Sequence, residues 1–375
     1  MIEPAAFFSF LQQNDIDFYT GVPDSLLKDV CAYITDYSSN EKNIVAANEG
    51  IAVAIACGYH LATGETPVVY MQNSGIGNAT NPLLSLADEE VYKLPLLLLV
   101  GWRGEPGIKD EPQHIKQGEV TIALFEAMKI PHIILDTEWE KAEKQMNTLL
   151  TLIKEKNAPH AVIIRKDTFA TYKLQKQTEN IYPLSRERAL QIVVDSLGTK
   201  DIVLSTTGKL SRELFEYRKS AGQTHEKDFL TVGSMGHSCS IALGIALVKK
   251  NCNVYCLDGD GALIMHTGAL ANIGHLSPAN YKHIVFNNGA HESVGKQPTV
   301  AYQIELPQIA LSCDYKAVFR VTQISDLKKV LKTFRDEQGP GLLEIKVNLA
   351  SRDDLGRPTR TTHENKEDFM KFLEI

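Results

Sequence analysis

Long apolar runs, an excess of basic residues and paired cysteines are all missing from this sequence. No segment approaches the roughly 18 uninterrupted apolar residues that a membrane-spanning helix needs, and no basic segment followed by an apolar core opens the chain. The 39 basic residues are outnumbered by 46 acidic ones and form no basic arm, which disfavours nucleic acid as a partner. The six cysteines lie mostly in apolar segments and form no Cys-x-x-Cys array, a pattern typical of buried thiols. We therefore expect a reduced, cytoplasmic protein that binds neither membranes nor nucleic acids.

Short apolar runs that alternate with helical stretches are the main feature that is present. In the first half, the predicted strands are 44–47, 67–71, 94–100, 132–135 and 161–164. In the second half, they are 202–205, 253–257, 283–286, 317–320 and 341–347. Runs this apolar suit parallel strands that are buried on both faces. The alternation predicts an α/β protein with two doubly wound parallel sheets, each covered by helices on both faces.

A change in composition separates the two halves. Residues 168–183 are rich in Lys, Gln, Thr and Asn, show no strong period and end in a proline. Ser185 then begins a helix as a plausible N-cap. We expect one domain at 1–167, a linker at 168–183 and a second domain at 184–375, with no middle domain.

Oxygen-bearing side chains follow two predicted strands of the second half. Asp260, within a Gly-Asp-Gly string, follows the strand at 253–257, and Asn288 follows the strand at 283–286. A carboxylate and an amide oxygen suit Mg²⁺, which keeps its other positions for water and phosphate oxygens. The flanking glycines would let a diphosphate approach the backbone closely. Alternatively, both strings are ordinary turns, because Gly, Asp and Asn are common turn formers.

Glu49 is placed at the start of a helix in the first half. The segment 46–50 follows the first strand and leads into a helical run at 51–62, which stops at Thr63-Gly64. The carboxylate would then face the cleft at the carboxyl ends of the strands. Alternatively, it only stabilises the helix macrodipole.

The segments 48–52, 56–59 and 62–64 are similar to the pyrimidine-binding domain of thiamine-diphosphate enzymes. The Gly-Asp-Gly string, paired with Asn-Asn after 25 intervening residues (262–286), resembles the motif by which that family binds metal and diphosphate. The resemblance covers nearly the whole chain. It implies a pyrimidine-binding domain followed by a diphosphate-binding domain, with thiamine diphosphate and Mg²⁺ as cofactors. It also implies that Glu49 is catalytic, because the family's glutamate hydrogen-bonds the pyrimidine ring and activates the cofactor.

The same resemblance assigns the other residues around the cofactor. Those implied to bind it are Glu49, Asn73, Gly75, Thr206, Thr207, Gly208, Gly233, Ser234, Met235, Asp260, Gly261, Ala262 and Asn288. Those implied to hold the metal are Asp260, Asn288 and, through its backbone carbonyl, Ala290. Met235 would wedge the cofactor into its bent form, although a methionine that only fills the core is the alternative. The loop at 72–78 resembles the family's glycine-rich loop between strand and helix. Alternatively, it is only a flexible loop and helix cap.

Four loops indicate the branch of the family. The segment 21–25 is similar to phosphonopyruvate and sulfopyruvate decarboxylases, and the segments 101–114, 287–295 and 353–358 favour the phosphonate enzymes. This resemblance implies decarboxylation of 3-phosphonopyruvate to phosphonoacetaldehyde and CO₂, in phosphonate biosynthesis of the 2-aminoethylphosphonate type. The alternatives are decarboxylation of sulfopyruvate, a carboligase on the same scaffold and, in a different class, a non-catalytic phosphate- or nucleotide-binding protein.

A substrate with a phosphonate and a carboxylate needs local cations in an acidic chain. The residues that we expect near the substrate are Asp24, Ser25, Arg103, Lys109, Lys296, Arg352 and Arg357, although each cation could be only a solvated surface charge. His114 and His291 could donate the proton that completes the product, because histidine titrates near neutrality, and Glu292 is a competing acid. In the resembled family the cofactor lies between subunits, so we expect a homo-oligomer.

Overall fold

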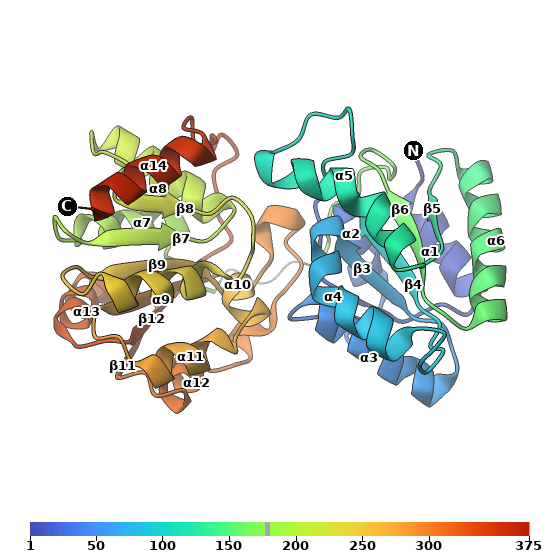
Figure 1. The fold of residues 1–375 in the computed structure, drawn as a ribbon, viewed down its shortest axis with the longest axis horizontal. Helices are drawn as coiled ribbons and strands as arrows, with labels where there is room; N and C mark the ends of the chain where they lie inside the picture. The colour runs from blue at the N-terminus through green and yellow to red at the C-terminus, as the bar shows by residue number, and fades with distance from the viewer. Residues whose placement is uncertain (177–180, 375) are drawn as a thin grey trace. The chain divides into compact units, whose positions relative to one another are not determined.

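The computed structural model describes residues 1–176 and 181–374 (Figure 1). The chain divides into two compact units. The first comprises Met1–Gln177 with His291–Gln297, and the second comprises Thr178–Ala290 with Pro298–Ile375. Residues 177–180 of the predicted linker lie outside the described residues, and the predicted domain boundaries stay a prediction.

The first unit is built on a six-stranded parallel sheet in the order β2-β1-β3-β4-β6-β5. Its strands are β1 (Tyr19–Gly21), β2 (Asn43–Val45), β3 (Val68–Gln72), β4 (Leu97–Gly101), β5 (His132–Ile134) and β6 (His160–Ile164). Its helices are α1 (Pro4–Gln13), α2 (Lys28–Tyr37), α3 (Glu49–Thr63), α4 (Ile76–Pro82), α5 (Pro112–Ala127) and α6 (Trp139–Lys156).

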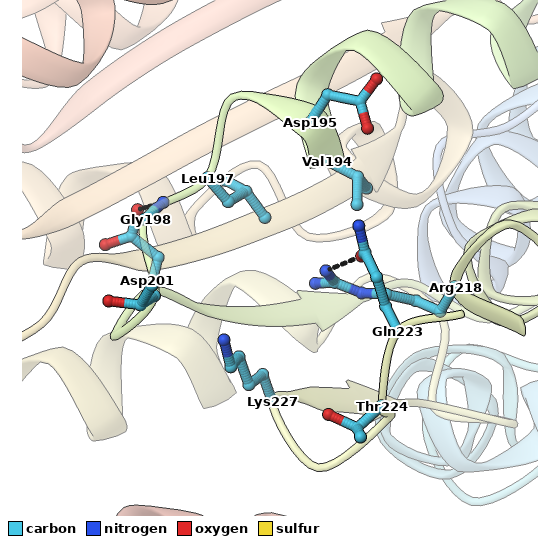
Figure 2. Close-up of a pocket in the computed structure, with 10 residues that line it drawn as sticks. Val194, Asp195, Leu197, Gly198, Asp201, Arg218, Gln223, Thr224 and Lys227 are labelled. Carbon is cyan, nitrogen blue, oxygen red and sulfur yellow. Dashed lines mark hydrogen bonds between the residues drawn. The ribbon is translucent and has the colours of Figure 1, made fainter. Parts of the chain in front are cut away.

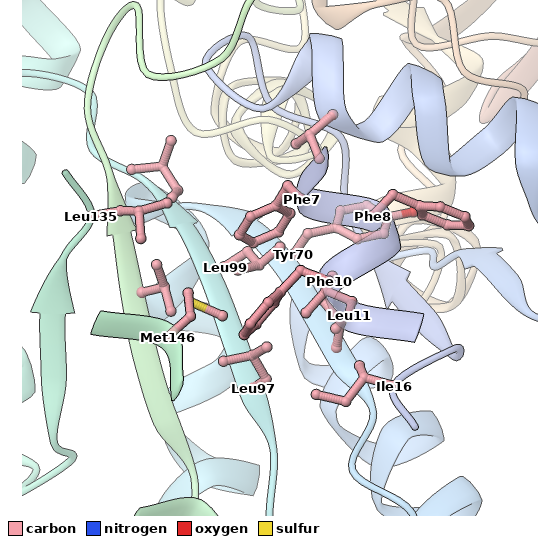
Figure 3. Packing of buried hydrophobic residues seen from close by; sticks show 14 of the residues in the cluster. Phe7, Phe8, Phe10, Leu11, Ile16, Tyr70, Leu97, Leu99, Leu135 and Met146 are labelled. Atoms are coloured by element: carbon pink, nitrogen blue, oxygen red, sulfur yellow. The ribbon is translucent and has the colours of Figure 1, made fainter. Parts of the chain in front are cut away.

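Both faces of this sheet are buried. Side chains of α1, α2 and α6 cover one face, where Phe7 and Phe10 of α1 lie near Leu97 and Leu99 of β4 and Met146 of α6 (Figure 3). Helices α3, α4 and α5 cover the other face. Burial on both sides explains why these strands read as continuous apolar runs in the sequence.

The second unit repeats this architecture with the order β11-β12-β10-β9-β7-β8. Its strands are β7 (Ile202–Ser205), β8 (Asp228–Leu230), β9 (Val254–Gly259), β10 (Tyr281–Asn287), β11 (Ala317–Val321) and β12 (Gly341–Lys346). Its helices are α7 (Arg186–Asp195), α8 (Lys209–Ser220), α9 (Ser238–Val248), α10 (Asp260–Met265), α11 (Ala269–Leu276), α12 (Leu306–Ser312), α13 (Ile324–Asp336) and α14 (Thr362–Leu373). Helices α7, α8 and α13 pack on one face, and α9, α11, α12 and α14 pack on the other.

The predicted fold class is confirmed, and each of the ten predicted strands coincides with an observed one. The sequence analysis missed β1 and β8. Each has only three residues, and a glycine in β1 and an aspartate in β8 interrupt the apolar character that marks the longer strands. Ser185 caps α7 as predicted, because its side chain accepts a hydrogen bond from the backbone amide of Arg188.

In each sheet the strand order reverses at one place, and this place matters for ligand binding. In the first unit the chain leaves β1 for β2 on one side and returns to β3 on the other, and in the second it does the same at β7, with β8 and β9 on its two sides. Ligands of open α/β sheets bind outside the carboxyl ends of the strands at such switch points. No helix among the described residues combines the length and apolar character needed to cross a membrane.

Candidate active site

The predicted site residues fall into two groups, one in each unit. In the first unit, Glu49 begins α3 behind Asn48, whose side chain accepts a hydrogen bond from the backbone amide of Ile51 at 2.9 Å. The Glu49 side chain is buried, and its carboxylate accepts a hydrogen bond from the Asn78 amide of α4 at 2.7 Å. Gly75 packs so closely that a Cβ there would lie 2.4 Å from Glu49 Oε1. The carboxylate is therefore held in one position by α4 and the turn before it.

Polar side chains meet at the carboxyl ends of β1 and β3. Asp24 follows β1 and is fully buried. It accepts hydrogen bonds from the Gln72 side chain at 2.6 Å and from the Leu26 backbone amide at 2.8 Å. Asn73, which is also buried, donates through its amide to the Arg103 backbone carbonyl at 2.8 Å. The structure thus brings Asp24 and Asn73 to the predicted switch point.

Arg103 is held by the loop that contains it. Its Nη1 donates to Ser25 Oγ at 2.7 Å, its Nε donates to Asp110 Oδ2 at 2.8 Å, and its Nη2 is also paired with Asp110. Burial raises the pKa of Asp110, but hydrogen bonds from Arg103 and from the amides of Glu111 and Gly104 outweigh it and leave that pKa well below its usual range. Arg103 therefore organises the 103–110 loop, a role that the sequence analysis did not anticipate.

Two of the three candidate proton donors, His114 and His291, have lowered pKa values. Burial, followed by the charge of Arg103, lowers the pKa of His114 despite nearby carboxylates. Burial lowers the pKa of His291 to about 4. Both rings are therefore neutral near pH 7, whereas the cationic ring is the stronger acid. Glu292 is buried, while Lys109 and Lys296 are exposed.

In the second unit, the loop after β7 brings a threonine hydroxyl and the start of α8 to the switch point. Thr206 is buried, and its Oγ1 has no hydrogen-bond partner among the described residues. Thr207 Oγ1 donates to the Val232 carbonyl at 2.7 Å, which ties this loop to the one after β8. Gly208 has a φ of 101°, which favours glycine, and it directly precedes α8. A helix start of this kind can bind a phosphate.

The loop after β8 carries Gly233, Ser234 and Met235. Ser234 is exposed with a φ of 55°, and Met235 is half-buried rather than packed fully into the core. At Gly236, which has a φ of 83°, a Cβ would lie 2.8 Å from the Ala262 carbonyl. The loop therefore lies directly against the start of α10.

The predicted metal residues lie at the ends of the neighbouring strands β9 and β10. Asp260 begins α10, and its carboxylate accepts a hydrogen bond from Thr299 Oγ1 at 2.5 Å. Burial raises the pKa of Asp260 to about 6, although Thr299 and the backbone amide of Asn288 favour the ionised form. Asn288 Oδ1 accepts a hydrogen bond from the Ala290 amide at 3.1 Å. The structure thus brings Asp260 and Asn288 together, as the sequence predicts.

These residues fit thiamine diphosphate and Mg²⁺. A buried carboxylate whose ionised form is penalised by burial is stabilised by a cation, and the amide oxygen of Asn288 adds a second hard ligand. The unpartnered Thr206 hydroxyl and the helix start after Gly208 are suited to bind a diphosphate at the same edge of the sheet.

Arg352 and Arg357 lie in the C-terminal segment before α14, where the neighbouring Ser351 accepts a hydrogen bond from Lys209 at the start of α8. Arg352 pairs with Glu187 at 3.0 Å and with Asp354 at 2.9 Å, and it also pairs with Glu216. Arg357 is exposed. Their contact with substrate stays a prediction, and the structure gives Arg352 a place in a cluster of carboxylates.

The second unit also contains a cavity of about 340 Å³ at the opposite edge of its sheet (Figure 2). Its lining includes Asp201, which directly precedes β7, and Lys227, which directly precedes β8. Arg218 in its wall is already paired with the buried Asp228 and hydrogen-bonded to Gln223. This cavity lies at the amino ends of the strands, away from the switch-point residues.

Both halves of the chain match known proteins. Residues 4–125 match the N-terminal TPP binding domain of thiamine pyrophosphate enzymes, and residues 206–345 match the C-terminal TPP binding domain. A phosphonopyruvate decarboxylase of Streptomyces viridochromogenes is 30% identical over 364 residues, which cover 92% of this chain and 89% of that protein. The chain belongs to the thiamine pyrophosphate enzyme family. Within this family, a second phosphonopyruvate decarboxylase, from Streptomyces hygroscopicus, is 30% identical over 99% of this chain and 94% of its own length. A sulfopyruvate decarboxylase of Methanosarcina acetivorans is 28% identical over 87% of this chain and 85% of its own length.

Family membership makes the chain a thiamine-diphosphate-dependent 2-oxo acid decarboxylase. The first matched range contains Glu49 and Arg103, and the second contains Thr206, Asp260 and Asn288. Several partners of these residues escaped the sequence analysis because nothing local marks them. Thr299 and Glu344 were not singled out at all, whereas Gln72, Asn78, Asp110 and Asn287 were placed only within the predicted loops, without these partners.

Proposed function

We propose that this enzyme decarboxylates 3-phosphonopyruvate to phosphonoacetaldehyde and CO₂ with thiamine diphosphate and Mg²⁺. The observation that carries this proposal is the pair of buried carboxylates at switch-point strand ends, Glu49 in one unit and Asp260 beside Asn288 in the other. Near full-length similarity to two phosphonopyruvate decarboxylases supports the choice of substrate.

Each group of residues then has one task. Thiamine diphosphate, when bound, accepts the electron pair that is released as CO₂ leaves. Glu49 holds a hydrogen bond to the pyrimidine, and its fixed position supports this role. Asp260, Asn288 and the carbonyl of Ala290 would hold Mg²⁺ on the diphosphate, and Thr206 to Gly208 would bind the diphosphate itself. His114, His291 or Glu292 supplies the proton that replaces the lost carboxylate.

The phosphonate is proposed to bind near Ser25 and Arg103. Arg103 is oriented by Asp110, so its guanidinium keeps donors in a defined plane for an anion, and the exposed Lys109 lies on the same loop. Sulfopyruvate is the second candidate substrate, because the sulfopyruvate decarboxylase of Methanosarcina acetivorans is nearly as similar over most of the chain.

A comparison of three 2-oxo acids tests the substrate. With thiamine diphosphate and Mg²⁺ present, kcat/KM for phosphonopyruvate should exceed that for pyruvate by at least about 100-fold, because pyruvate lacks the second anionic group that Arg103 and Lys109 would bind. The measurement is CO₂ release with identification of the aldehyde. Faster turnover of sulfopyruvate than of phosphonopyruvate would contradict the substrate, and carbon–carbon coupling to an added aldehyde as the main outcome would favour a carboligase.

The glycine against Glu49 provides a second test. Gly75→Ala should lower kcat by about 100-fold, because a Cβ at this position displaces the Glu49 carboxylate and a misplacement of about 1 Å can cost that much. Steady-state kinetics at saturating cofactor and Mg²⁺ measure the effect. Gly77→Ala is the matched control, because a Cβ at Gly77 meets nothing within 4 Å. Equal rates for the two variants would argue against this positioning of Glu49.

We also propose that the chain forms a homo-oligomer. Helix α3 is apolar on most sides, yet Ile51 and Leu61 on it are 44% and 71% exposed in the single chain. A helix that is apolar all round is normally buried, so these side chains support a subunit contact along α3.

A further inference from the structure

A buried asparagine next to the metal residues ties their loop to the rest of the sheet. Asn287, the last residue of β10, is fully buried. Its Oδ1 accepts a hydrogen bond from the Gly289 amide at 3.0 Å, inside the loop that carries Asn288 and Ala290. Its Nδ2 donates to the Ala301 carbonyl at 3.1 Å and to Glu344 Oε1 at 2.7 Å. The orientation of this amide therefore sets the backbone from which the predicted metal ligands project.

Glu344 of β12 holds that amide in place. In the parallel register Glu344 lies opposite Arg320 of β11, and Lys346 lies opposite Asn287. The fully buried Glu344 carboxylate pairs with Arg320 Nε at 2.5 Å and with Lys346 Nζ at 2.8 Å. Two cationic side chains therefore lie against this carboxylate while its Oε1 accepts the hydrogen bond from Asn287.

Thr299 joins the loop after β10 to the carboxylate of Asp260. Thr299 donates through Oγ1 to Asp260, and its backbone amide donates to the Gly289 carbonyl at 2.8 Å. Gly289 is thus hydrogen-bonded through its amide to Asn287 and through its carbonyl to Thr299. Any movement of Asn287 would be transmitted through Gly289 to the Asp260 side of the site.

We propose that Glu344, acting through Asn287, is a positioning residue that sets the Mg²⁺ affinity of the cofactor site. This inference rests on the proposed function, because it takes Asp260 and Asn288 as the metal ligands. Partners that orient metal ligands typically change metal affinity by about 10–100-fold when they are mutated.

Glu344→Gln tests the inference. A glutamine presents one oxygen and one NH₂ group to three donors, Asn287, Lys346 and Arg320, so at least one of them must face another donor. We expect the Mg²⁺ dissociation constant, measured by calorimetry at saturating thiamine diphosphate, to rise by about 10-fold or more. At saturating Mg²⁺ the variant's kcat should return close to the wild-type value, because Glu344 only positions the metal loop.

Glu213→Gln is the matched control. Glu213 is also buried in the same unit and forms a bidentate pair with Arg186 at 2.8 Å, so its loss removes a similar ion pair that, among the described residues, does not involve the metal loop. An unchanged Mg²⁺ constant in Glu344→Gln, or equal changes in both variants, would overturn the inference. If Glu344→Gln fails to fold, Asn287→Ser carries the same expectation. Absence of Mg²⁺-dependent cofactor binding by the wild-type protein would instead overturn the proposed function and the inference with it.

Discussion

Glu49→Gln is expected to lower kcat for decarboxylation by about 10²–10⁴-fold, the range that a positioned acid or base contributes. The amide keeps an oxygen that can accept the hydrogen bond from Asn78, so the local structure should persist. It carries no charge, however, and cannot favour the pyrimidine form that a carboxylate stabilises. Stopped-flow or steady-state CO₂ release measures the rate, and urea denaturation measures the free energy of unfolding.

Asp29→Asn is the control for this prediction. Asp29 is also an acidic residue that is buried in the first turn of a helix, and it is hydrogen-bonded to Lys28 and to the Tyr172 amide. If Glu49 acted only through the helix macrodipole, the two variants would lose similar stability and neither would lose much activity. If Glu49→Gln retained full activity, the catalytic role of Glu49 would be refuted and a non-catalytic binding protein would be favoured.

Asp260→Asn has the second large expected effect, because it removes the charged ligand of the proposed Mg²⁺ site. The Mg²⁺ affinity at saturating thiamine diphosphate should fall by more than the roughly 10–100-fold expected for a residue that only orients ligands. Thr299 can still donate to the asparagine oxygen, so the loop should keep its contacts. Calorimetric titration with Mg²⁺ measures the loss, and undiminished affinity would exclude Asp260 as a ligand.

The same substitution should stabilise the protein when Mg²⁺ is removed with a chelator. Burial raises the pKa of Asp260 from its ordinary value near 3.8 to about 6, so the folded state holds a proton that the unfolded state releases. The wild-type stability contributed by this group is therefore lost as the pH rises from about 4 to about 6. At pH 7 Asp260→Asn should raise the free energy of unfolding by on the order of 1–3 kcal/mol. A lower free energy of unfolding for the variant would contradict the prediction that the buried Asp260 carboxylate destabilises the metal-free protein.

The residues at strand ends show which parts of the site can be predicted from the sequence. Glu49, Asp260 and Asn288 could be placed because each follows an apolar run within a few residues, and the end of a parallel strand defines which edge of the sheet it faces. Arg103 was found as a charge, but its pairing with Asp110 and Ser25 was not predicted, because it depends on how a loop folds back.

The short strands β1 and β8 show the same limit. Each becomes a strand because a longer neighbour, β3 for β1 and β7 for β8, supplies hydrogen bonds on its flank, and three residues carry too little periodicity to reveal that.

The sequence by itself determined the two α/β sheets and the placement of carboxylates at strand ends, because these follow from local patterns of apolar and polar residues. The cofactor class came from the resemblance of its motifs to a family. Only the tertiary structure decided what holds those carboxylates. Asn287 meets Glu344 across 57 positions because β10 pairs with β12, and Asp260 meets Thr299 across 39 because the chain after β10 folds back onto the start of α10. Such partners are set by which strands lie side by side, and no local pattern in the chain specifies that.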